Sequence, residues 1–256
     1  MSGHLGIGRA MLAAALLAVG TLPMSAGSMP TGFVYLRDID PSIEQDMRYA
    51  GSDNFTRRPV PGYDAAECVL VGEAARALSA AQADLKPLGL SLKVYDCYRP
   101  AQAVAAFVDW SKEPDDPNAK LEHYPELAKC ALFPGYIATR SGHSRGSTLD
   151  VTIVPLESSP AVSDGEDGIA CTEAQPSDNS LDMGTGFDCF DPKANTDAPG
   201  LTPEQQRNRK LLLDVMSRHG FKNYPKEIWH YTFEPEPYPD TYFDFPIMPR
   251  PTDGKS

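Results

Sequence analysis

Hydrophobic and polar positions along the chain predict a mixture of strands and helices. Short runs rich in β-branched and aromatic residues predict strands, whereas apolar residues three or four positions apart predict helices. The expected strands are residues 33–36, 92–96, 149–154 and 229–233, and the expected helices are residues 65–83, 101–110 and a segment that begins at 202–203 and stops at 220. Because strands and helices do not alternate regularly, we expect an α+β domain with a central antiparallel sheet flanked by helices.

Individual residues indicate where two of the helices begin and which face of one strand is polar. Pro100 is expected at the first helical position of the 101–110 helix. Thr202 can cap the last helix, with Pro203 in its first turn and Gln205 closing a capping box. In the strand at 149–154, alternation places the apolar residues on one face. Asp150 then points to the other face, toward any cleft that the sheet carries.

Two stretches show little periodicity. Residues 155–199 are rich in Ser, Asp, Gly and Pro. A loop of this length in a compact domain is usually functional or mobile. The Pro-rich tail from 235 to 251 is expected to wrap the surface in extended form.

The first residues have the pattern of a secretory signal peptide. Arg9 precedes an apolar run over residues 10–19, and small residues follow at 25–28. A membrane anchor is the alternative, but the run is short and is broken by Gly20 and Pro23. We therefore expect residues 1–27 to be cleaved. Residues 28–256 would then form one exported domain, periplasmic or secreted, with no membrane association after cleavage.

Length and charge narrow the classes of function. The 256 residues suffice for one sizeable domain, and contents of 41% hydrophobic and 23% charged residues are ordinary for a globular protein. The formal net charge of −12, without a long Lys/Arg run, argues against nucleic-acid binding, which needs a basic face. No feature of the sequence indicates an obligate protein partner.

Export affects which bonds are expected for the five cysteines. In an oxidising compartment, disulfides are expected rather than zinc–cysteine sites. The pair Cys171–Cys189 is favoured because it flanks the Ser/Asp/Gly-rich loop, and Cys68–Cys97 comes second. An odd count leaves at least one thiol free or paired elsewhere, with Cys130 as the candidate. The sequence alone does not determine the connectivity.

Two imidazoles and two carboxylates form the candidate chemistry. His143 lies in a Ser/Gly-rich loop seven positions before Asp150, and Glu227 lies three positions before His230. Two His and one Asp can hold a Zn²⁺ ion whose fourth position stays open for water. Glu227 can then activate that water. A single His is more often structural, and the remaining histidines lack comparable neighbours.

These residues fall within motifs that resemble a known family. The chain is similar to the VanX-type D-alanyl-D-alanine dipeptidases, zinc enzymes that share a fold with D,D-carboxypeptidases and the hedgehog signalling domain. The matching segments are Ser141–Asp150, Glu227–Tyr231, Tyr49, Asp53–Thr56, Tyr95–Pro100, Met183–Gly184, Phe187–Asp188, Pro237–Pro239 and Tyr242–Pro246. They occur in the same order through nearly the whole mature chain. The resemblance implies that residues 28–256 form a zinc D-Ala-D-Ala dipeptidase domain with a hedgehog/D,D-peptidase-like fold.

Carried over position by position, the resemblance assigns a role to eight residues. It implies one Zn²⁺ per chain with three protein ligands, which are His143, Asp150 and His230. It implies Glu227 as the catalytic base and Arg99 as the residue that stabilises the transition state. The substrate's ammonium group would be held by Tyr49, Ser141 and Asp188. A disulfide at Cys189 would hold Asp188 in place.

The expected function is hydrolysis of D-alanyl-D-alanine to two D-alanines, with this small dipeptide as the implied partner. Two alternatives stay open: a D,D-carboxypeptidase acting on longer peptidoglycan peptides, and a zinc-containing binding module without catalysis. The presence of Glu227 and Arg99 argues against the second. The best-known enzymes of the family act in the cytoplasm. Export therefore favours scavenging or recycling of dipeptides derived from the cell wall.

Overall fold

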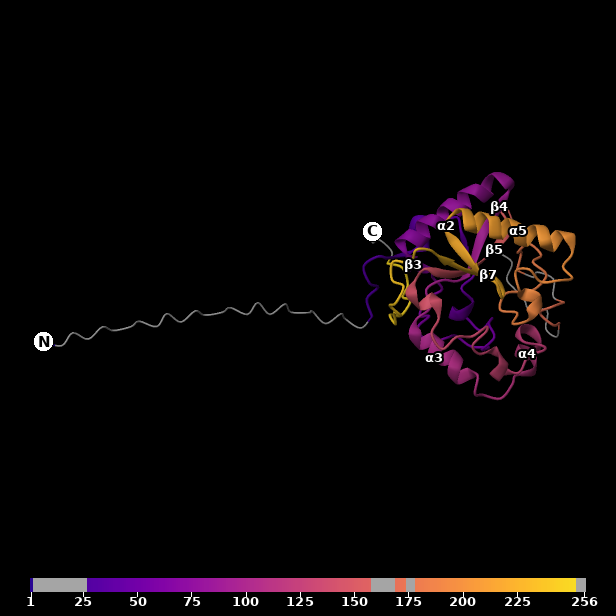
Figure 1. The fold of residues 1–256 in the computed structure, drawn as a ribbon, viewed down its shortest axis with the longest axis horizontal. Helices are drawn as coiled ribbons and strands as arrows, with labels where there is room; N and C mark the ends of the chain where they lie inside the picture. The colour runs from indigo at the N-terminus through magenta and orange to yellow at the C-terminus, as the bar shows by residue number, and fades with distance from the viewer. Residues whose placement is uncertain (2–26, 158–168, 174–177, 252–256) are drawn as a thin grey trace.

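The computed structural model describes residues 1, 27–157, 169–173 and 178–251 (Figure 1). The helices are α1 (Leu36–Ile39), α2 (Gly72–Leu85), α3 (Ala101–Trp110), α4 (Pro117–His123) and α5 (Pro203–Arg218). The strands are β1 (Phe33–Tyr35), β2 (Glu44–Gln45), β3 (Val69–Val71), β4 (Leu90–Asp96), β5 (Thr148–Pro155), β6 (Phe221–Tyr224) and β7 (Glu227–Phe233). Short 3-10 helices are η1 (Arg48–Ala50), η2 (Lys86–Leu88), η3 (Lys129–Leu132), η4 (Gly142–Arg145) and η5 (Pro192–Ala194).

Nearly all of the expected signal peptide, residues 1–27, lies outside the described residues, and so does part of the long loop over residues 155–199. None of the helices within the described ranges has the length and apolar character that a membrane span requires.

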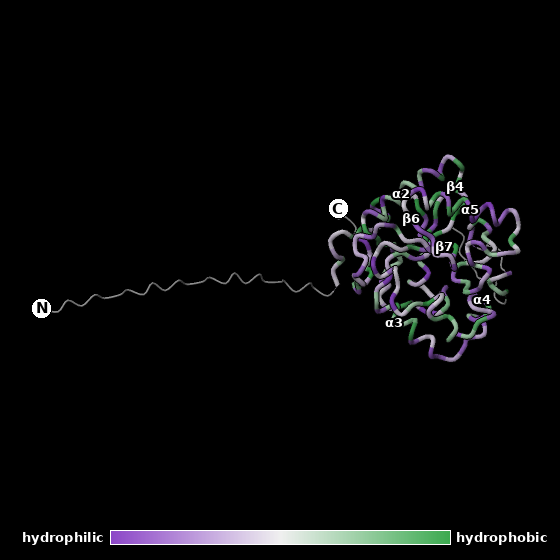
Figure 2. The backbone as a smooth tube through the Cα atoms, viewed as in Figure 1, coloured by the Kyte–Doolittle hydropathy of each residue, from purple (hydrophilic) through white to green (hydrophobic). Residues whose placement is uncertain are grey.

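A five-stranded sheet in the order β2-β4-β5-β7-β6 forms the centre of the fold. The pairs β4–β5, β5–β7 and β6–β7 are antiparallel, which confirms the α+β prediction, whereas the short edge strand β2 runs parallel to β4. Helices α2 and α5 lie together on one side of the sheet, and α3 and α4 lie on the other side (Figure 1). In Figure 2, hydrophobic (green) and hydrophilic (purple) positions are interspersed through the folded part of the chain, including its strands.

The predicted helix over residues 65–83 is wrong in its first turns. Residues Val69–Val71 form β3, which pairs antiparallel with β1, and the helix begins only at Gly72 and runs to Leu85. Three consecutive branched apolar residues suit a strand that is buried on both faces. The helical spacing of Val69 and Leu70 was therefore coincidental, and pairing with a distant strand decided their conformation.

The helix starts follow the local signals closely. Thr202 and Gln205 form the capping box expected before α5. Gly220, just beyond the end of α5, has φ 84°, the left-handed conformation that glycine tolerates best. Pro100 is the N-cap residue of α3 rather than its first helical residue. The difference is a single position, within the usual uncertainty of helix ends.

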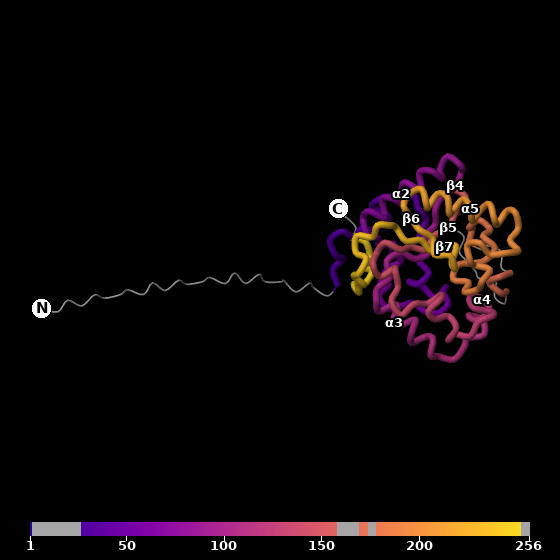
Figure 3. Tube along the Cα trace, in the orientation of Figure 1, coloured from indigo at the N-terminus to yellow at the C-terminus, as the bar shows by residue number. Residues whose placement is uncertain are grey.

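The Pro-rich tail does more than wrap the surface. Phe245 and Ile247 are buried, and the ring of Phe245 stacks on Tyr98 with 4.2 Å between centroids. The tail also meets the start of the domain, where the Tyr35 hydroxyl donates a hydrogen bond to the Met248 carbonyl oxygen. Figure 3 shows this yellow segment beside the indigo one. The tail therefore closes one edge of the hydrophobic core.

Both expected disulfides are present. Cys68 bonds to Cys97 and Cys171 bonds to Cys189, whereas Cys130 is a free, exposed thiol. Cys97 follows the last residue of β4, and Cys189 lies in the irregular region before α5. Each bridge therefore ties down a segment next to a residue that the sequence marks as functional.

Candidate metal centre and substrate cavity

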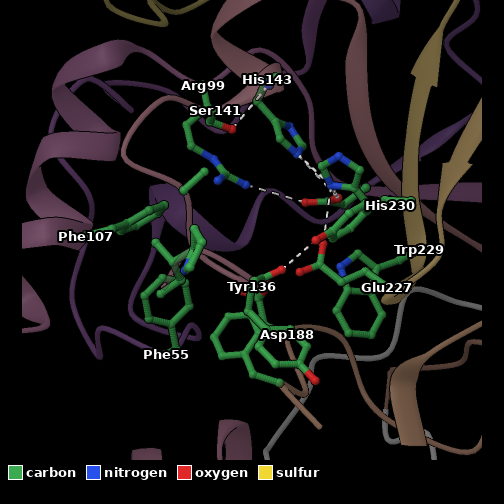
Figure 4. A pocket seen from close by; sticks show the side chains of 18 of the residues that line it. Phe55, Arg99, Phe107, Tyr136, Ser141, His143, Asp188, Glu227, Trp229 and His230 are labelled. Carbon is green, nitrogen blue, oxygen red and sulfur yellow. Dashed lines mark hydrogen bonds and ion pairs between the residues drawn. The ribbon is translucent and has the colours of Figure 1, made fainter. Parts of the chain in front are cut away.

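Three side chains that are far apart in the sequence converge at one point. His143 Nε2 lies 3.3 Å from His230 Nδ1 and 3.4 Å from Asp150 Oδ1, and His230 Nδ1 lies 3.2 Å from the same carboxylate oxygen. These atoms form a nearly equilateral triangle, and Figure 4 shows the two imidazoles facing each other. His143 and Asp150 are buried, and His230 is partly exposed. The structure thus brings together the three residues that the sequence suggested as metal ligands.

The register of the sheet explains why two of them meet. Asp150 and His230 are directly opposite each other in the antiparallel pair β5–β7. Side chains at opposite positions share a face, with their Cβ atoms about 4.5–5.5 Å apart. On the other side of β5, Asp96 is opposite Asp150, beside an irregularity in the β4–β5 pairing. Asp96, Asp150 and His230 therefore form a row across three strands.

An irregularity in β7 brings Glu227 to the same place. Asn223 of β6 pairs with Tyr231 of β7, and the next residue of β6, Tyr224, pairs with Glu227. One step along β6 therefore corresponds to four residues of β7, so β7 bulges at this point. The Asn223 amide holds this bulge by donating to the carbonyl oxygens of Glu227 at 3.0 Å and His230 at 3.1 Å. In a regular strand, residues three apart face opposite ways. Here Glu227 Oε2 lies 3.4 Å from His230 Nδ1.

The loop before β5 presents the third candidate ligand, His143. Ser141 caps η4 by accepting a hydrogen bond from the His143 N–H at 3.3 Å. Gly146 follows η4 with φ 82°, and a Cβ at this position would lie 2.2 Å from a ring atom of Phe33. Only glycine fits this turn, because the backbone is left-handed and the aromatic ring leaves no room. The glycine in the motif therefore has a steric cause.

A backbone carbonyl determines which nitrogen of His143 faces the triangle. His143 Nδ1 lies 2.7 Å from the carbonyl oxygen of Cys97. Since a carbonyl oxygen only accepts, Nδ1 carries the proton and donates it. In a neutral imidazole the lone pair then belongs to Nε2, the atom at the corner of the triangle. The imidazole is thus oriented as a metal ligand.

The triangle has the dimensions of a tetrahedral metal site. Ligand atoms about 2.0–2.1 Å from a tetrahedral centre are about 3.3–3.4 Å from one another. The three observed separations lie between 3.2 and 3.4 Å. In addition, Asp150 Oδ1 is buried and accepts no hydrogen bond from any described residue, which is unfavourable for a carboxylate oxygen. A cation bound among these three atoms would give Asp150 Oδ1 the partner that it lacks. Three protein ligands would also leave the fourth tetrahedral position open.

Arg99 is held beside the triangle by a buried carboxylate. Its Nε donates to Asp96 Oδ2 at 2.9 Å, and its Nη2 lies 2.8 Å from the same oxygen and 3.6 Å from Asp150 Oδ2. The Tyr63 hydroxyl donates to Asp96 Oδ1 at 2.7 Å. The guanidinium also lies over the ring of Tyr49, 5.0 Å from its centroid. These contacts hold a positive charge in one position next to the candidate metal site.

Asp188 lies at the other end of the cavity from His143 (Figure 4). The Tyr49 hydroxyl donates to Asp188 Oδ2 at 2.7 Å, and no Lys or Arg side chain within the described ranges forms an ion pair with Asp188. Burial, followed by the nearby charge of Asp150, raises the pKa of Asp188 to about 8. A positively charged group bound against Asp188 would favour its ionised form. This carboxylate is therefore suited to binding an ammonium group.

The site as a whole is a small cavity with an excess of negative charge. Its volume is about 240 Å³, below the range of about 300–1,000 Å³ that is typical for drug-sized ligands. Its described lining includes three carboxylates, those of Asp150, Asp188 and Glu227, against the single guanidinium of Arg99. Burial and then the neighbouring carboxylates raise the pKa of Glu227 well above its usual range. The cavity therefore favours small ligands and cations.

All eight residues singled out from the sequence line this one cavity; they are Tyr49, Arg99, Ser141, His143, Asp150, Asp188, Glu227 and His230. Two other histidines lie elsewhere. His123 packs behind Asp188, with its Nδ1 3.2 Å from the Asp188 carbonyl oxygen, and His219 pairs with Asp84 at the surface. Neither approaches the triangle, in agreement with the expectation from the sequence.

Sequence reasoning missed two supporting residues. Asp96 orients Arg99 and lies within the Tyr95–Pro100 motif. Its position at the end of the predicted strand 92–96 could have marked it as a residue of the site. Asn223, which holds the β7 bulge, has no signal in the sequence, because its role depends on the pairing of β6 with β7. Aromatic walls of the cavity, such as Phe107 and Trp229, were also not assigned to it.

Comparison with known proteins identifies the relatives of this chain. A family model described as D-ala-D-ala dipeptidase matches residues 29–168 and 168–248. A D-alanyl-D-alanine dipeptidase from Streptomyces coelicolor is 38% identical over 220 residues, which is 86% of this chain and 100% of the relative. The enzyme of the same name from Enterococcus faecalis is 36% identical over the same shares of both chains. The one from Escherichia coli is 32% identical over 78% of this chain and 84% of its own.

A solved structure also aligns with the fold. It is that of a variant of the vancomycin-resistance D,D-pentapeptidase VanY in complex with Zn(II), at 15% identity and a TM-score of 0.36, covering 65% of this chain and 73% of that chain. The family assignment depends on the sequence matches, which extend over most of the chain and the whole length of two relatives. This chain belongs to the D-ala-D-ala dipeptidase family of peptidases.

Proposed function

We propose that this protein is a zinc-dependent dipeptidase that hydrolyses D-alanyl-D-alanine to two D-alanines. One small cavity combines two features, and this observation carries the proposal. The first is a triangle of candidate ligand atoms with the dimensions of a tetrahedral metal site, and the second is the buried carboxylate of Asp188, which forms no ion pair with a Lys or Arg of the described residues. The triangle suits a hydrolytic metal ion, and Asp188 suits a free amino terminus. Relatives at 32–38% identity, each named D-alanyl-D-alanine dipeptidase, support the choice of substrate.

In this proposal His143, Asp150 and His230 hold one zinc ion. When bound, zinc lowers the pKa of a water molecule and polarises a carbonyl group. Glu227 takes the proton from the attacking water and passes it to the leaving amine, and its carboxylate lies at the edge of the ligand triangle. Arg99, which Asp96 holds in place, stabilises the negative charge that develops on the carbonyl oxygen.

Asp188 and Tyr49 bind the substrate's ammonium group, whereas Ser141 lies beside His143, at the other end of the cavity from Asp188 (Figure 4). The Asp188 carboxylate supplies the charge, and Tyr49 orients it through the 2.7 Å hydrogen bond. Ser141 lines the same cavity. A substrate extended at its amino end would place a neutral amide against Asp188, and this buried carboxylate would stay unpaired. The arrangement therefore favours a free dipeptide over a longer peptidoglycan peptide.

The zinc-loaded protein is expected to hydrolyse D-alanyl-D-alanine much faster than its N-acetylated form. Loss of one partner of a buried charge pair costs about 2–5 kcal/mol, which is roughly a 30-fold to several-thousand-fold difference. Measuring kcat/KM for both compounds, with L-alanyl-L-alanine in the same panel, tests this expectation. Faster hydrolysis of the acetylated compound would replace the dipeptidase with a D,D-carboxypeptidase. Absence of hydrolysis with zinc bound would favour a non-catalytic binding module.

We also propose that the protein is exported and acts outside the cytoplasm, on dipeptides derived from the cell wall. Two disulfides next to site residues support an oxidising compartment. Fractionation of the native host is expected to find the chain in the exported fraction, shortened by about 27 residues as the signal-peptide pattern predicts. Mass spectrometry of its N-terminus gives the cleavage point. A full-length chain confined to the cytoplasm would contradict this proposal.

A further inference from the structure

The backbone at Asp188 is in an unusual conformation. Its φ is 55°, in the left-handed region that residues other than glycine rarely adopt. Such a conformation persists only where the surrounding structure imposes it. The Asp188 side chain is also almost fully buried, and burial opposes its ionised form. The buried position of this carboxylate therefore depends on the contacts around it.

Side-chain contacts, rather than regular secondary structure, restrain this position: the Tyr49 hydroxyl donates to Asp188 Oδ2 at 2.7 Å, and the neighbouring Phe187 stacks on Tyr95 with 4.5 Å between ring centroids. The described segment from 178 to 201 contains only the short helix η5, so no strand or long helix fixes Asp188. Its carbonyl oxygen lies 3.2 Å from His123 Nδ1, and the Phe190 N–H donates to the His123 carbonyl oxygen at 2.6 Å. The covalent restraint is next to it, because Cys189 is bonded to Cys171.

The disulfide is anchored on the wall of the cavity. Cys171 and Cys189 are buried in a small apolar cluster, separate from the main core, with Ala194, Ile228 and Trp229. The last two residues belong to the β7 bulge and lie between Glu227 and His230 in the chain. The Cys171 N–H also donates to the Leu121 carbonyl oxygen at 3.2 Å, which ties the bridge to α4. The disulfide next to Asp188 therefore packs against the strand that carries the proposed base and one proposed ligand.

We propose that the Cys171–Cys189 disulfide is a positioning element for substrate selectivity: it holds Asp188 in the cavity and thereby makes the enzyme specific for a free amino terminus. The inference rests on the proposed function of Asp188 as the ammonium-binding residue. Breaking the bridge leaves the ligand triangle intact, because the three ligands are placed by β5, β7 and η4. It releases the carboxylate that selects the dipeptide.

The test compares the zinc-loaded wild type with the double variant Cys171→Ser/Cys189→Ser. Cys130→Ser is the matched control, because Cys130 is exposed and unpaired. In the double variant, KM for D-alanyl-D-alanine is expected to rise roughly 10- to 100-fold, in line with the effect of misplacing a binding group by about 1 Å. We expect kcat to change less than about three-fold and zinc content to stay at one per chain, because the machinery of the chemical step is untouched. Preference for the free dipeptide over its N-acetyl form should fall by the same factor as KM rises.

A double-mutant cycle separates positioning from general loosening. In an Asp188→Asn background the dipeptide preference is already lost, so removing the disulfide should produce no further change in that preference. If removing the disulfide instead loosens the structure generally, it should change the preference equally in the wild-type and the Asp188→Asn backgrounds. An unchanged preference in the double variant, or additive effects in the cycle, would overturn the inference. If the wild type itself shows no preference for a free amino terminus, the proposed function of Asp188 fails, and this result is distinguishable from the others.

A second measurement covers the case in which the double variant does not fold. The folded, oxidised wild type is treated with dithiothreitol, whose two thiols give two electrons and two protons to the bridge and form a cyclic disulfide, leaving two protein thiols. Alkylation and mass spectrometry then identify which cysteines are reduced. Loss of dipeptide preference in step with reduction of Cys171 and Cys189 is the expected result. Preference that persists after their complete reduction would overturn the inference.

Discussion

Replacing Glu227 with Gln is expected to lower kcat by roughly 10²- to 10⁴-fold, the usual contribution of a general acid–base group. The amide keeps the size of the side chain but cannot accept the proton of the attacking water. Zinc content should stay at the wild-type level, because Glu227 contributes none of the three atoms of the ligand triangle. Steady-state kinetics and metal analysis of the same preparation check both expectations.

The control for this variant is Glu204→Gln, the same change at an exposed position in the first turn of α5. It should leave kcat unaltered. Without metal, the Glu227→Gln protein should unfold at a temperature no lower than that of the metal-free wild type. Burial and neighbouring charges raise the pKa of Glu227, and a carboxylate with such a raised pKa does not stabilise the fold at neutral pH. Wild-type activity in the Gln variant would remove Glu227 from the mechanism.

Removal of the metal is the second large effect that we expect. Dialysis against a chelator should abolish hydrolysis, and adding back Zn²⁺ should restore it. Replacing His230 with Ala should weaken zinc binding by more than about 100-fold, since loss of a residue that merely supports a ligand already costs 10- to 100-fold. Competition with a chromophoric chelator measures the affinity directly. Zinc should also raise the unfolding temperature of the wild type, because it binds the folded state.

His219→Ala is the matched control for this variant. His219 follows α5 and pairs with Asp84 at the surface, away from the cavity. Its replacement should leave both zinc affinity and activity unchanged. Zinc affinity that survives the loss of His230 would mean that the ion is held elsewhere, and the ligand triangle would lose its assigned role.

Local features of the sequence predicted some elements well. The capping box at Thr202 and Gln205 determines where α5 begins, because all its hydrogen bonds lie within one turn. The β-branched run at 149–154 became β5 for a similar local reason. The helix predicted from residue 65 failed at Val69–Val71, where pairing with β1 prevailed over helical spacing. Its error shows the limit of periodicity when a distant partner is available.

The candidate site was predictable in its residue types and unpredictable in its geometry. The sequence alone marks two imidazoles and an aspartate as possible ligands, because imidazole nitrogens and carboxylate oxygens both bind zinc. It contains no information on distance. The near-equilateral triangle exists because Asp150 is in register with His230, and a slip of one residue would turn each side chain to the opposite face.

What the sequence indicated by itself is therefore the candidate chemistry and some local structure: the candidate ligand set, the nearby carboxylate, the odd cysteine and the capped helix. All of these depend on residue identity or on contacts within a few positions of the chain. The tertiary structure decided the rest, namely the β7 bulge held by Asn223, the orientation of His143 by the Cys97 carbonyl oxygen and the position of Asp188 beside a disulfide. Each of these contacts joins segments brought together only by folding, so their geometry follows from strand register and packing rather than from local preference.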